Sequence, residues 1–337
     1  MKYLITGAAG FVGFHSARAL LDAGHEVLGI DNFSPYYDPN LKRARNALLE
    51  KSANYRLDEF SILDHERLSG ALESFTPDRV LHLAAQPGVR YSLENPHAYV
   101  ETNIVGTLNL LEAIRRSTPG LDHLLVASTS STYGANVSFP FRETDRTAFP
   151  ISIYAATKSS AEALTHSYSH LFDIPTTCFR FFTVYGPWGR PDMAPYIFTK
   201  AMLEGQEIEI FGDGTSRRDY TYVGDLVSAV LRLADVSPSC SGPDGPNDSD
   251  SPAARWRTVN IGGGTSVVLN DFIATLEEAV GKPAMRRNSG TQPGDVRATE
   301  SDVSYLDSLI GEAPSTPLSV GLAETVAWYR DHFNIHA

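Results

Sequence analysis

The chain has 337 residues, 42% hydrophobic and 20% charged, which supplies enough apolar material for a packed core and excludes a disordered or fibrous protein. Its net charge of −12 disfavours general binding to nucleic acid, because that affinity comes mainly from neutralising phosphates. Only Cys178 and Cys240 occur, no run reaches the roughly 18 apolar residues of a membrane span, and a strand-like segment begins at Lys2, so we expect a cytoplasmic chain without structural metal, membrane contact or signal peptide.

The first half of the chain alternates apolar, strand-like runs with amphipathic stretches. The strand-like runs are 3–6, 27–30, 79–83 and 124–127, and the amphipathic ones are 11–23 and 100–116. Such alternation predicts a doubly wound parallel sheet with helices on both faces, which binds ligands at the carboxyl ends of its strands.

A glycine-rich turn follows the first strand-like run. Gly7, Gly10 and Gly13 stand between a strand and a helix, and Asp31 closes the next strand. Glycines at such a turn let a pyrophosphate approach the amides at the helix N-terminus, whereas a Cβ would obstruct it. A tight turn with close helix packing is the alternative, but the strand, the helix and the acid together favour a Rossmann-type dinucleotide site. Asp31 would accept hydrogen bonds from both ribose hydroxyls and repel a 2′-phosphate, which favours NAD over NADP.

Two later segments carry polar groups suited to chemistry. Tyr154 and Lys158 lie at i and i+4 of a predicted helix, so both side chains share one face. A neighbouring ammonium and an oxidised nicotinamide would favour the tyrosine phenolate, and Tyr154 would then act as a base. A tyrosine and a lysine at this spacing more often mean only a helix whose lysine is exposed to solvent and whose tyrosine contacts the core. The cluster VASTSSTYG at 126–134 is either a capped turn or, beside a nicotinamide, a site that orients a sugar.

The second half is rich in turns and predicts a smaller α/β lobe interleaved with the first domain. We expect 1–180 to form the NAD-binding domain and 181–337 mainly a substrate lobe, with 220–262 returning to the larger domain. The Ser, Pro, Gly and Asp run at 237–254 predicts a mobile surface loop.

Several of these strings resemble a known family. GAAGFVG, STSSTYG and YAATK are similar to the extended short-chain dehydrogenase/reductase family, within it the nucleotide-sugar epimerases and dehydratases. The strings DNFSPYYDPNLKRAR, LAAQPGVRYSLENPHAYVETN and RFFTVYGPWGRPDM most resemble the branch that epimerises UDP-glucuronate, over nearly the whole chain. The resemblance implies NAD-dependent conversion of UDP-glucuronate to UDP-galacturonate through a 4-keto sugar. It also implies a homodimer that pairs the helices at 100–116 and 154–172.

The resemblance implies a role for individual residues. Tyr154 would be the base and acid on the sugar 4-hydroxyl, Lys158 its electrostatic partner and ribose ligand, and Thr129 a hydrogen-bond partner of the same oxygen. The implied cofactor-binding residues are Gly7, Gly10, Phe11, Val12, Gly13, Asp31, Asn32, Ser61, Ile62, Leu83, Ala84, Ala85, Asn103, Tyr154, Lys158 and Phe182. Ser61 and Ile62 fall where an Asp-Ile pair normally flanks adenine, and Phe182 is expected beside the nicotinamide.

The implied substrate-binding residues are Gln86, Val89, Arg90, Thr129, Ser130, Ser131, Thr183, Arg190, Glu209, Ile210, Phe211, Arg218 and Asp295. Among them, the hydroxyl residues and Arg190 would hold the sugar carboxylate, and Arg218 the diphosphate. Residues 209–211 would form an edge for the uracil, and Asp295 would bind the uridine ribose.

Three alternatives stay open. Related dehydratases carry Asp-Glu within the Ser/Thr segment and decarboxylases a Glu two residues before its Tyr. Here those positions hold Ser130 and Ser131, so a second proton-transfer group is missing. The nearest rivals are a UDP-glucose/galactose 4-epimerase and a UDP-glucuronate decarboxylase. A non-catalytic NAD-binding sensor is a different class, expected to have lost Tyr154 or Lys158.

Overall fold

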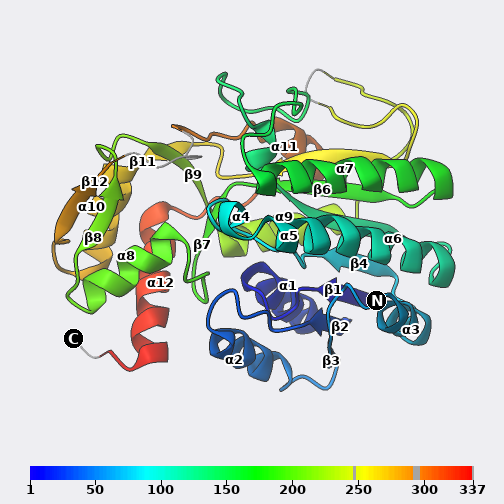
Figure 1. The fold of residues 1–337 in the computed structure, drawn as a ribbon, viewed down its shortest axis with the longest axis horizontal. Helices are drawn as coiled ribbons and strands as arrows, with labels where there is room; N and C mark the ends of the chain where they lie inside the picture. Colours follow the sequence, from blue (N-terminus) through cyan, green and yellow to red (C-terminus); the bar gives the residue numbers. More distant parts are fainter. Residues whose placement is uncertain (246–247, 291–296, 336–337) are drawn as a thin grey trace.

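A seven-stranded, wholly parallel sheet forms the larger part of the molecule (Figure 1). The structure is a computed structural model that describes residues 1–245, 248–290 and 297–335. The strands in spatial order are β10 (Trp256–Ile261), β6 (Thr176–Phe181), β5 (His123–Thr129), β4 (Arg79–His82), β1 (Lys2–Thr6), β2 (Glu26–Asp31) and β3 (Tyr55–Glu59). The strand order changes direction between β1 and β4. The segments that follow these two strands therefore diverge and leave a crevice at the carboxyl edge of the sheet.

Helices cover both faces of this sheet, as the alternating pattern predicts. One face carries α1 (Phe11–Asp22), α2 (Pro39–Leu49), α9 (Val223–Ala234) and α11 (Ser304–Ile310), and the other α3 (His65–Phe75), α6 (Gly106–Ser117) and α7 (Ile153–Phe172). Successive residues of β1 enter different cores, because side chains alternate across a strand: Ile5 packs with α1 and α9, and Leu4 with α3 and α6. The Rossmann-type fold is therefore confirmed.

A smaller lobe stands beside the carboxyl edge of the large sheet, at the left of Figure 1. It contains the sheet β11 (Ser266–Val268), β9 (Arg217–Tyr222) and β7 (Thr183–Tyr185), the pair β12 (Arg286–Ser289) and β8 (Ile208–Phe211), and the helices α8 (Ala194–Leu203), α10 (Leu269–Val280) and α12 (Leu318–Phe333). Between β9 and β11 the chain runs back through α9 and β10 to the large sheet, so the two parts are interleaved.

Two segments differ from their sequence-based expectations. The predicted helix at 100–116 is interrupted: α4 (Tyr91–Glu94) and α5 (Pro96–Tyr99) lead into a π-helical segment (Val100–Val105) before α6 begins. In the loop predicted at 237–254, Asp250, Ser251 and Ala254 are buried, so this part is not exposed throughout as its polar composition predicts. None of the described helices is both long and apolar enough to cross a membrane.

Candidate active site

Two adjoining cavities lie at the carboxyl edge of the large sheet. The first cavity runs from the glycine-rich turn toward α7, and the second runs from α7 toward the smaller lobe. Six residues line both cavities: Phe11, Val12, Ser128, Tyr154, Phe181 and Arg190. A group bound in one cavity therefore meets a group bound in the other at this shared wall.

The glycine-rich turn closes one end of the first cavity. Gly7 has a φ of +75°, and a Cβ there would lie 2.8 Å from the Ala84 nitrogen; a Cβ on Gly13 would lie 2.1 Å from the Gly7 carbonyl oxygen. The first turn of α1 borders the cavity, and no side chain caps it. A helix N-terminus in this state suits an anion such as a pyrophosphate.

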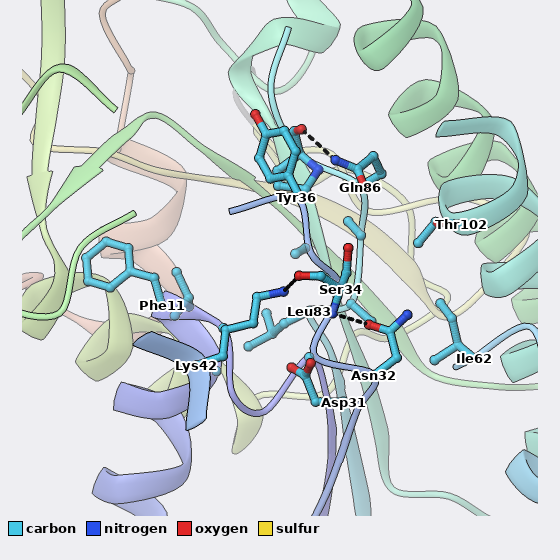
Figure 2. Close-up of a pocket in the computed structure, with 18 of the residues that line it drawn as sticks. Phe11, Asp31, Asn32, Ser34, Tyr36, Lys42, Ile62, Leu83, Gln86 and Thr102 are labelled. Carbon is cyan, nitrogen blue, oxygen red and sulfur yellow. Dashed lines mark hydrogen bonds between the residues drawn. The ribbon is translucent and has the colours of Figure 1, made fainter. Parts of the chain in front are cut away.

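Asp31 and Lys42 stand together at the next part of the first cavity (Figure 2). The Asp31 carboxylate ends β2 and accepts from the amides of Ala9 at 3.1 Å and Phe33 at 2.8 Å. Lys42 reaches from α2 and donates to the Ser34 carbonyl at 3.0 Å. Burial lowers the pKa of Lys42, while Asp31 opposes that shift. Adjacent carboxylate and ammonium groups provide an acceptor and a donor for a ribose diol.

Most residues that the sequence assigns to the cofactor line the first cavity, including Asn32, Ser61, Ile62 and the stretch 83–85. Two lie elsewhere. Asn103 is buried behind the wall, where its side chain accepts from the Gln86 amide at 2.7 Å and donates to the Gln86 carbonyl at 3.1 Å. Phe182 lines the second cavity.

The first turns of α7 place Tyr154 in the shared wall and Lys158 in the lining of the first cavity. Ser152 caps the helix by accepting from the Ala155 amide at 3.1 Å. Burial raises the pKa of Tyr154, and the charge of Arg190 and a hydrogen bond with Thr129 oppose that shift. Burial lowers the pKa of Lys158 to about 8, against the opposing effects of Cys178 and Glu162. Arg190 is therefore a cation that acts on the tyrosine hydroxyl in this site.

A buried ion pair supports the wall from behind. Glu162, one turn after Lys158 on α7, pairs with Arg180 of β6 through bonds of 3.0 and 2.9 Å. The same carboxylate accepts from the Ser128 hydroxyl at 2.5 Å. All three side chains are buried, so this arrangement fixes the end of β5 against α7. Nothing in the sequence distinguishes Ser128 from the other hydroxyl residues of its run.

The second cavity gathers most of the predicted substrate residues. Those that line it are Val89, Arg90, Thr129, Ser130, Ser131, Thr183, Arg190 and Arg218. Gln86 lines the first cavity instead.

The predicted uracil edge at 209–211 does not itself line the second cavity. Ile210 belongs to the core of the smaller lobe, and Glu209 accepts from the Ser289 hydroxyl at 2.6 Å. Phe211 contacts a residue of the cavity lining, because the Arg90 guanidinium lies 4.7 Å from the centre of its ring. Asp295 lies outside the described residues.

Several lining residues are absent from the sequence-based set. Ser34, Tyr36 and Lys42 line the first cavity and come from the string 31–45 that carries part of the family resemblance. Tyr36 donates to Asp192 at 3.0 Å, and Asp192 in turn accepts from Arg190 Nε at 3.1 Å. Only the folded chain shows that this loop and the segment around Arg190 meet.

Comparisons with known proteins place this site in a family. The model of the NAD dependent epimerase/dehydratase family matches residues 3–240. A Rhizobium meliloti (strain 1021) protein named probable UDP-glucuronate 4-epimerase is 48% identical over 336 residues, which cover 99% of this chain and 98% of that protein.

Two solved structures are similar over almost the entire chain. The Bacillus cereus UDP-glucuronic acid 4-epimerase, in complex with UDP-glucuronic acid and NAD, has a TM-score of 0.86 and 36% identity, covering 98% of this chain and 100% of that one. The Thermotoga maritima UDP-glucose 4-epimerase with UDP-glucose has a TM-score of 0.84 and 32% identity, covering 99% and 100%. The chain belongs to the NAD-dependent epimerase/dehydratase family.

Proposed function

We propose that this protein interconverts UDP-glucuronate and UDP-galacturonate at C4 of the sugar, with NAD in the first cavity and the sugar nucleotide in the second. The observation that carries the proposal is Tyr154, which lies in the wall common to both cavities. The names of the relatives support the choice of sugar. NAD, when bound, supplies the two-electron acceptor and donor that an epimerisation through a 4-keto sugar requires.

The lining of the first cavity suits each part of NAD. The uncapped N-terminus of α1 holds the pyrophosphate, since Gly10 and the first residues of the helix line the cavity. Asp31 and Lys42 hold the adenosine ribose, and the Asp31 carboxylate disfavours a 2′-phosphate there. Ser61 and Ile62 border the adenine.

Tyr154 takes the proton from the sugar 4-hydroxyl and returns it after the sugar has turned over. The phenolate that accepts this proton is stabilised by Arg190 and by the Thr129 hydroxyl, and the Lys158 ammonium on the same helix face adds to this, as the family resemblance implies. Lys158 also holds the nicotinamide ribose from its buried position on the same face of α7.

The sugar carboxylate binds to Thr129, Ser130, Ser131, Thr183 and Arg190, all of which line the second cavity. Holding the carboxylate is necessary because a 4-keto glucuronate is a β-keto acid. Such an acid loses carbon dioxide readily unless its carboxylate is kept out of the orientation in which the C–C bond breaks. Hydroxyls and a guanidinium hold the carboxylate without transferring a second proton.

The nucleotide extends toward the smaller lobe. Arg218 binds the diphosphate, and Arg90, stacked on Phe211, lines the path toward the uracil. Asp295 stays a predicted ligand of the uridine ribose.

The products separate this proposal from its rivals. We expect UDP-glucuronate to give UDP-galacturonate in an NMR assay, with deuterium at C4 retained in the product, and UDP-glucose to react far more slowly. Release of a UDP-pentose as the sole product contradicts the proposal in favour of decarboxylation. Preferential turnover of UDP-glucose identifies a hexose epimerase instead.

A Tyr154→Phe variant tests whether the chain catalyses the reaction at all. Loss of the hydroxyl removes the proton acceptor, so we expect turnover to fall by roughly 10²–10⁴-fold, while bound NAD, measured after extraction, stays unchanged. Tyr168→Phe is a matched control on the same helix, because Tyr168 bonds to Glu112 outside both cavities. Full turnover by Tyr154→Phe indicates a different mechanism.

We also propose a homodimer formed through α6 and α7, as the family resemblance implies. The end of α7 exposes Leu171 and Phe172, apolar residues suited to an interface. Light scattering at micromolar concentration should give twice the 36.8 kDa of one chain; a single-chain mass contradicts the dimer. The cytoplasmic location stays a prediction.

A further inference from the structure

We infer that Arg45, on α2, is a positioning residue for Arg190: it fixes the backbone at 188–189 so that the Arg190 guanidinium stays at the shared wall and selects a carboxylate-bearing sugar. This inference rests on the proposed role of Arg190. It assigns a function to a side chain that touches neither cavity.

Arg45 joins three separate segments of the chain. Its guanidinium is fully buried and donates from Nη2 to the carbonyls of Trp188 at 2.5 Å and Gly189 at 3.1 Å. From Nη1 it donates to the Ala9 carbonyl at 3.2 Å and the Tyr37 hydroxyl at 2.9 Å. One planar group thus ties the glycine-rich turn to the segment that carries Arg190.

The partners of Arg45 show what the charge is used for. Within the described ranges Arg45 forms no ion pair with a carboxylate, and every acceptor is a carbonyl or a phenol oxygen. Burying a guanidinium without a counter-ion is costly. Its rigid fork, however, reaches two consecutive carbonyls at once, which a lysine does not do. The geometry therefore favours a role in holding backbone.

The backbone held in this way has an unusual conformation. Trp188 has a φ of +61°, a value that bulky residues rarely adopt and that surrounding contacts must maintain. The preceding carbonyl, of Pro187, accepts from His15 Nε2 of α1 at 2.9 Å. Burial lowers the pKa of His15 to about 4, so this donor is the neutral imidazole. Side chains of α1 and α2 thus hold three consecutive carbonyls.

Arg190 follows directly and is the residue that this support positions. It lines both cavities, and its charge opposes the rise in the Tyr154 pKa. On the other side it is held by Asp192, which Tyr36 contacts. If the carbonyls at 188 and 189 lose their donor, the chain at Trp188 relaxes toward negative φ and the guanidinium leaves the carboxylate subsite.

The experiment compares binding of two sugar nucleotides that differ at the carboxylate. Calorimetry with NAD-saturated protein measures UDP-glucuronate and UDP-glucose binding to wild type, Arg45→Gln, Arg190→Met and the double variant. We expect Arg45→Gln to weaken UDP-glucuronate by at least about tenfold while UDP-glucose binding changes little. In the Arg190→Met background the Arg45 substitution should have no further effect, because a residue that acts through another is not additive with it.

Two variants keep the test interpretable. Arg43→Gln is the matched control, since Arg43 lies on the same helix but is exposed and pairs with Glu59; it should bind both nucleotides as wild type does. If Arg45→Gln does not fold, His15→Phe removes the donor to Pro187 while keeping an aromatic ring, and it should lower the preference for UDP-glucuronate in the same direction.

The outcomes separate this inference from the proposed function. If Arg190→Met removes the preference for UDP-glucuronate but Arg45→Gln retains it, the positioning role is wrong and the carboxylate subsite stands. Equal weakening of both nucleotides by Arg45→Gln, or an undiminished effect in the Arg190→Met background, also overturns it. If Arg190→Met leaves the preference intact, the carboxylate role of Arg190 fails and the inference fails with it.

Discussion

Lys158 has two properties that set the pH range of the site: it is buried, and it must stay protonated to stabilise a phenolate. Because burial lowers its pKa to about 8, the ammonium is lost as the pH rises through that value. We expect kcat/KM to fall above about pH 8, measured as a pH–rate profile under NAD saturation. Lys158→Arg keeps the positive charge at all these pH values. We expect this variant to react more slowly, but its kcat/KM should stay constant to a higher pH than that of wild type. An identical basic limb in both proteins rules out Lys158 as its cause.

Glu143 gives a second pH effect, on stability. It is buried beside β10; Oε1 accepts from the Asn260 amide at 2.7 Å, and Oε2 has no hydrogen-bond partner in the part of the chain that the structure describes. Burial raises its pKa from 4.5 to about 7, against the opposing effects of Asn260 and Arg180. Between these values the native state keeps a proton that the unfolded state has lost.

The free energy of unfolding should therefore contain a Glu143 contribution that decreases as the pH rises from 4.5 to about 7. Glu143→Gln mimics the protonated group, so relative to wild type it should gain about 2–3 kcal/mol between pH 5 and pH 8. Urea titrations of both proteins at the two pH values measure this difference, and other carboxylates cancel in it. A constant offset between the proteins contradicts the raised pKa.

Individual site residues differ in how far the sequence alone predicts them. Gly7, Gly13 and Asp31 follow from local pattern, because the strand, turn and helix that use them are consecutive in the chain. Lys42 and Arg45 do not, since nothing local distinguishes them from other basic residues on an amphipathic helix. Their roles depend on how α2 packs against the glycine-rich turn. The family resemblance includes the string 31–45, which contains both residues, but it does not predict their contacts.

At the scale of elements, the ion pair between Glu162 of α7 and Arg180 of β6 joins the catalytic helix to the sheet. Removing one partner leaves a buried, uncompensated charge, so we expect Glu162→Gln to lower the free energy of unfolding by about 3–5 kcal/mol. Glu112→Gln is the control, because Glu112 pairs with Arg115 and Arg116 near the surface of α6, where such pairs contribute at most about 1 kcal/mol. Equal losses in urea denaturation contradict a special role for the buried pair.

The elements that the sequence analysis misses share a physical cause. The strand β3 alternates apolar and charged residues and is only partly buried, so it gives no apolar run. In the loop at 237–254, Asp250 accepts from Tyr305 of α11 at 2.6 Å and Ser251 contacts His166 of α7 at 2.9 Å. Polar composition predicts exposure, but these side chains find buried partners supplied by distant parts of the chain.

At the scale of the whole molecule, the alternating pattern predicts most of the large sheet because the crossovers from β1 to β6 are local units of strand and helix, whereas β10 joins the sheet only after the chain has passed through the smaller lobe. The smaller lobe is harder to predict, since its short strands pair with strands far away in the sequence, as β8 does with β12 and β9 with β11. The meeting of the two cavities is not predictable from pattern, because residues as distant as Phe11, Ser128 and Arg190 contribute to one wall.

The return of α9 and β10 to the large sheet after β9 has a practical consequence for engineering. A chimera made with one crossover point, joining the first half of this chain to the second half of a relative, imports an edge strand of the large sheet along with the smaller lobe. Exchanging the smaller lobe alone therefore demands two cassettes, one on each side of the α9–β10 segment, with that segment kept from the recipient.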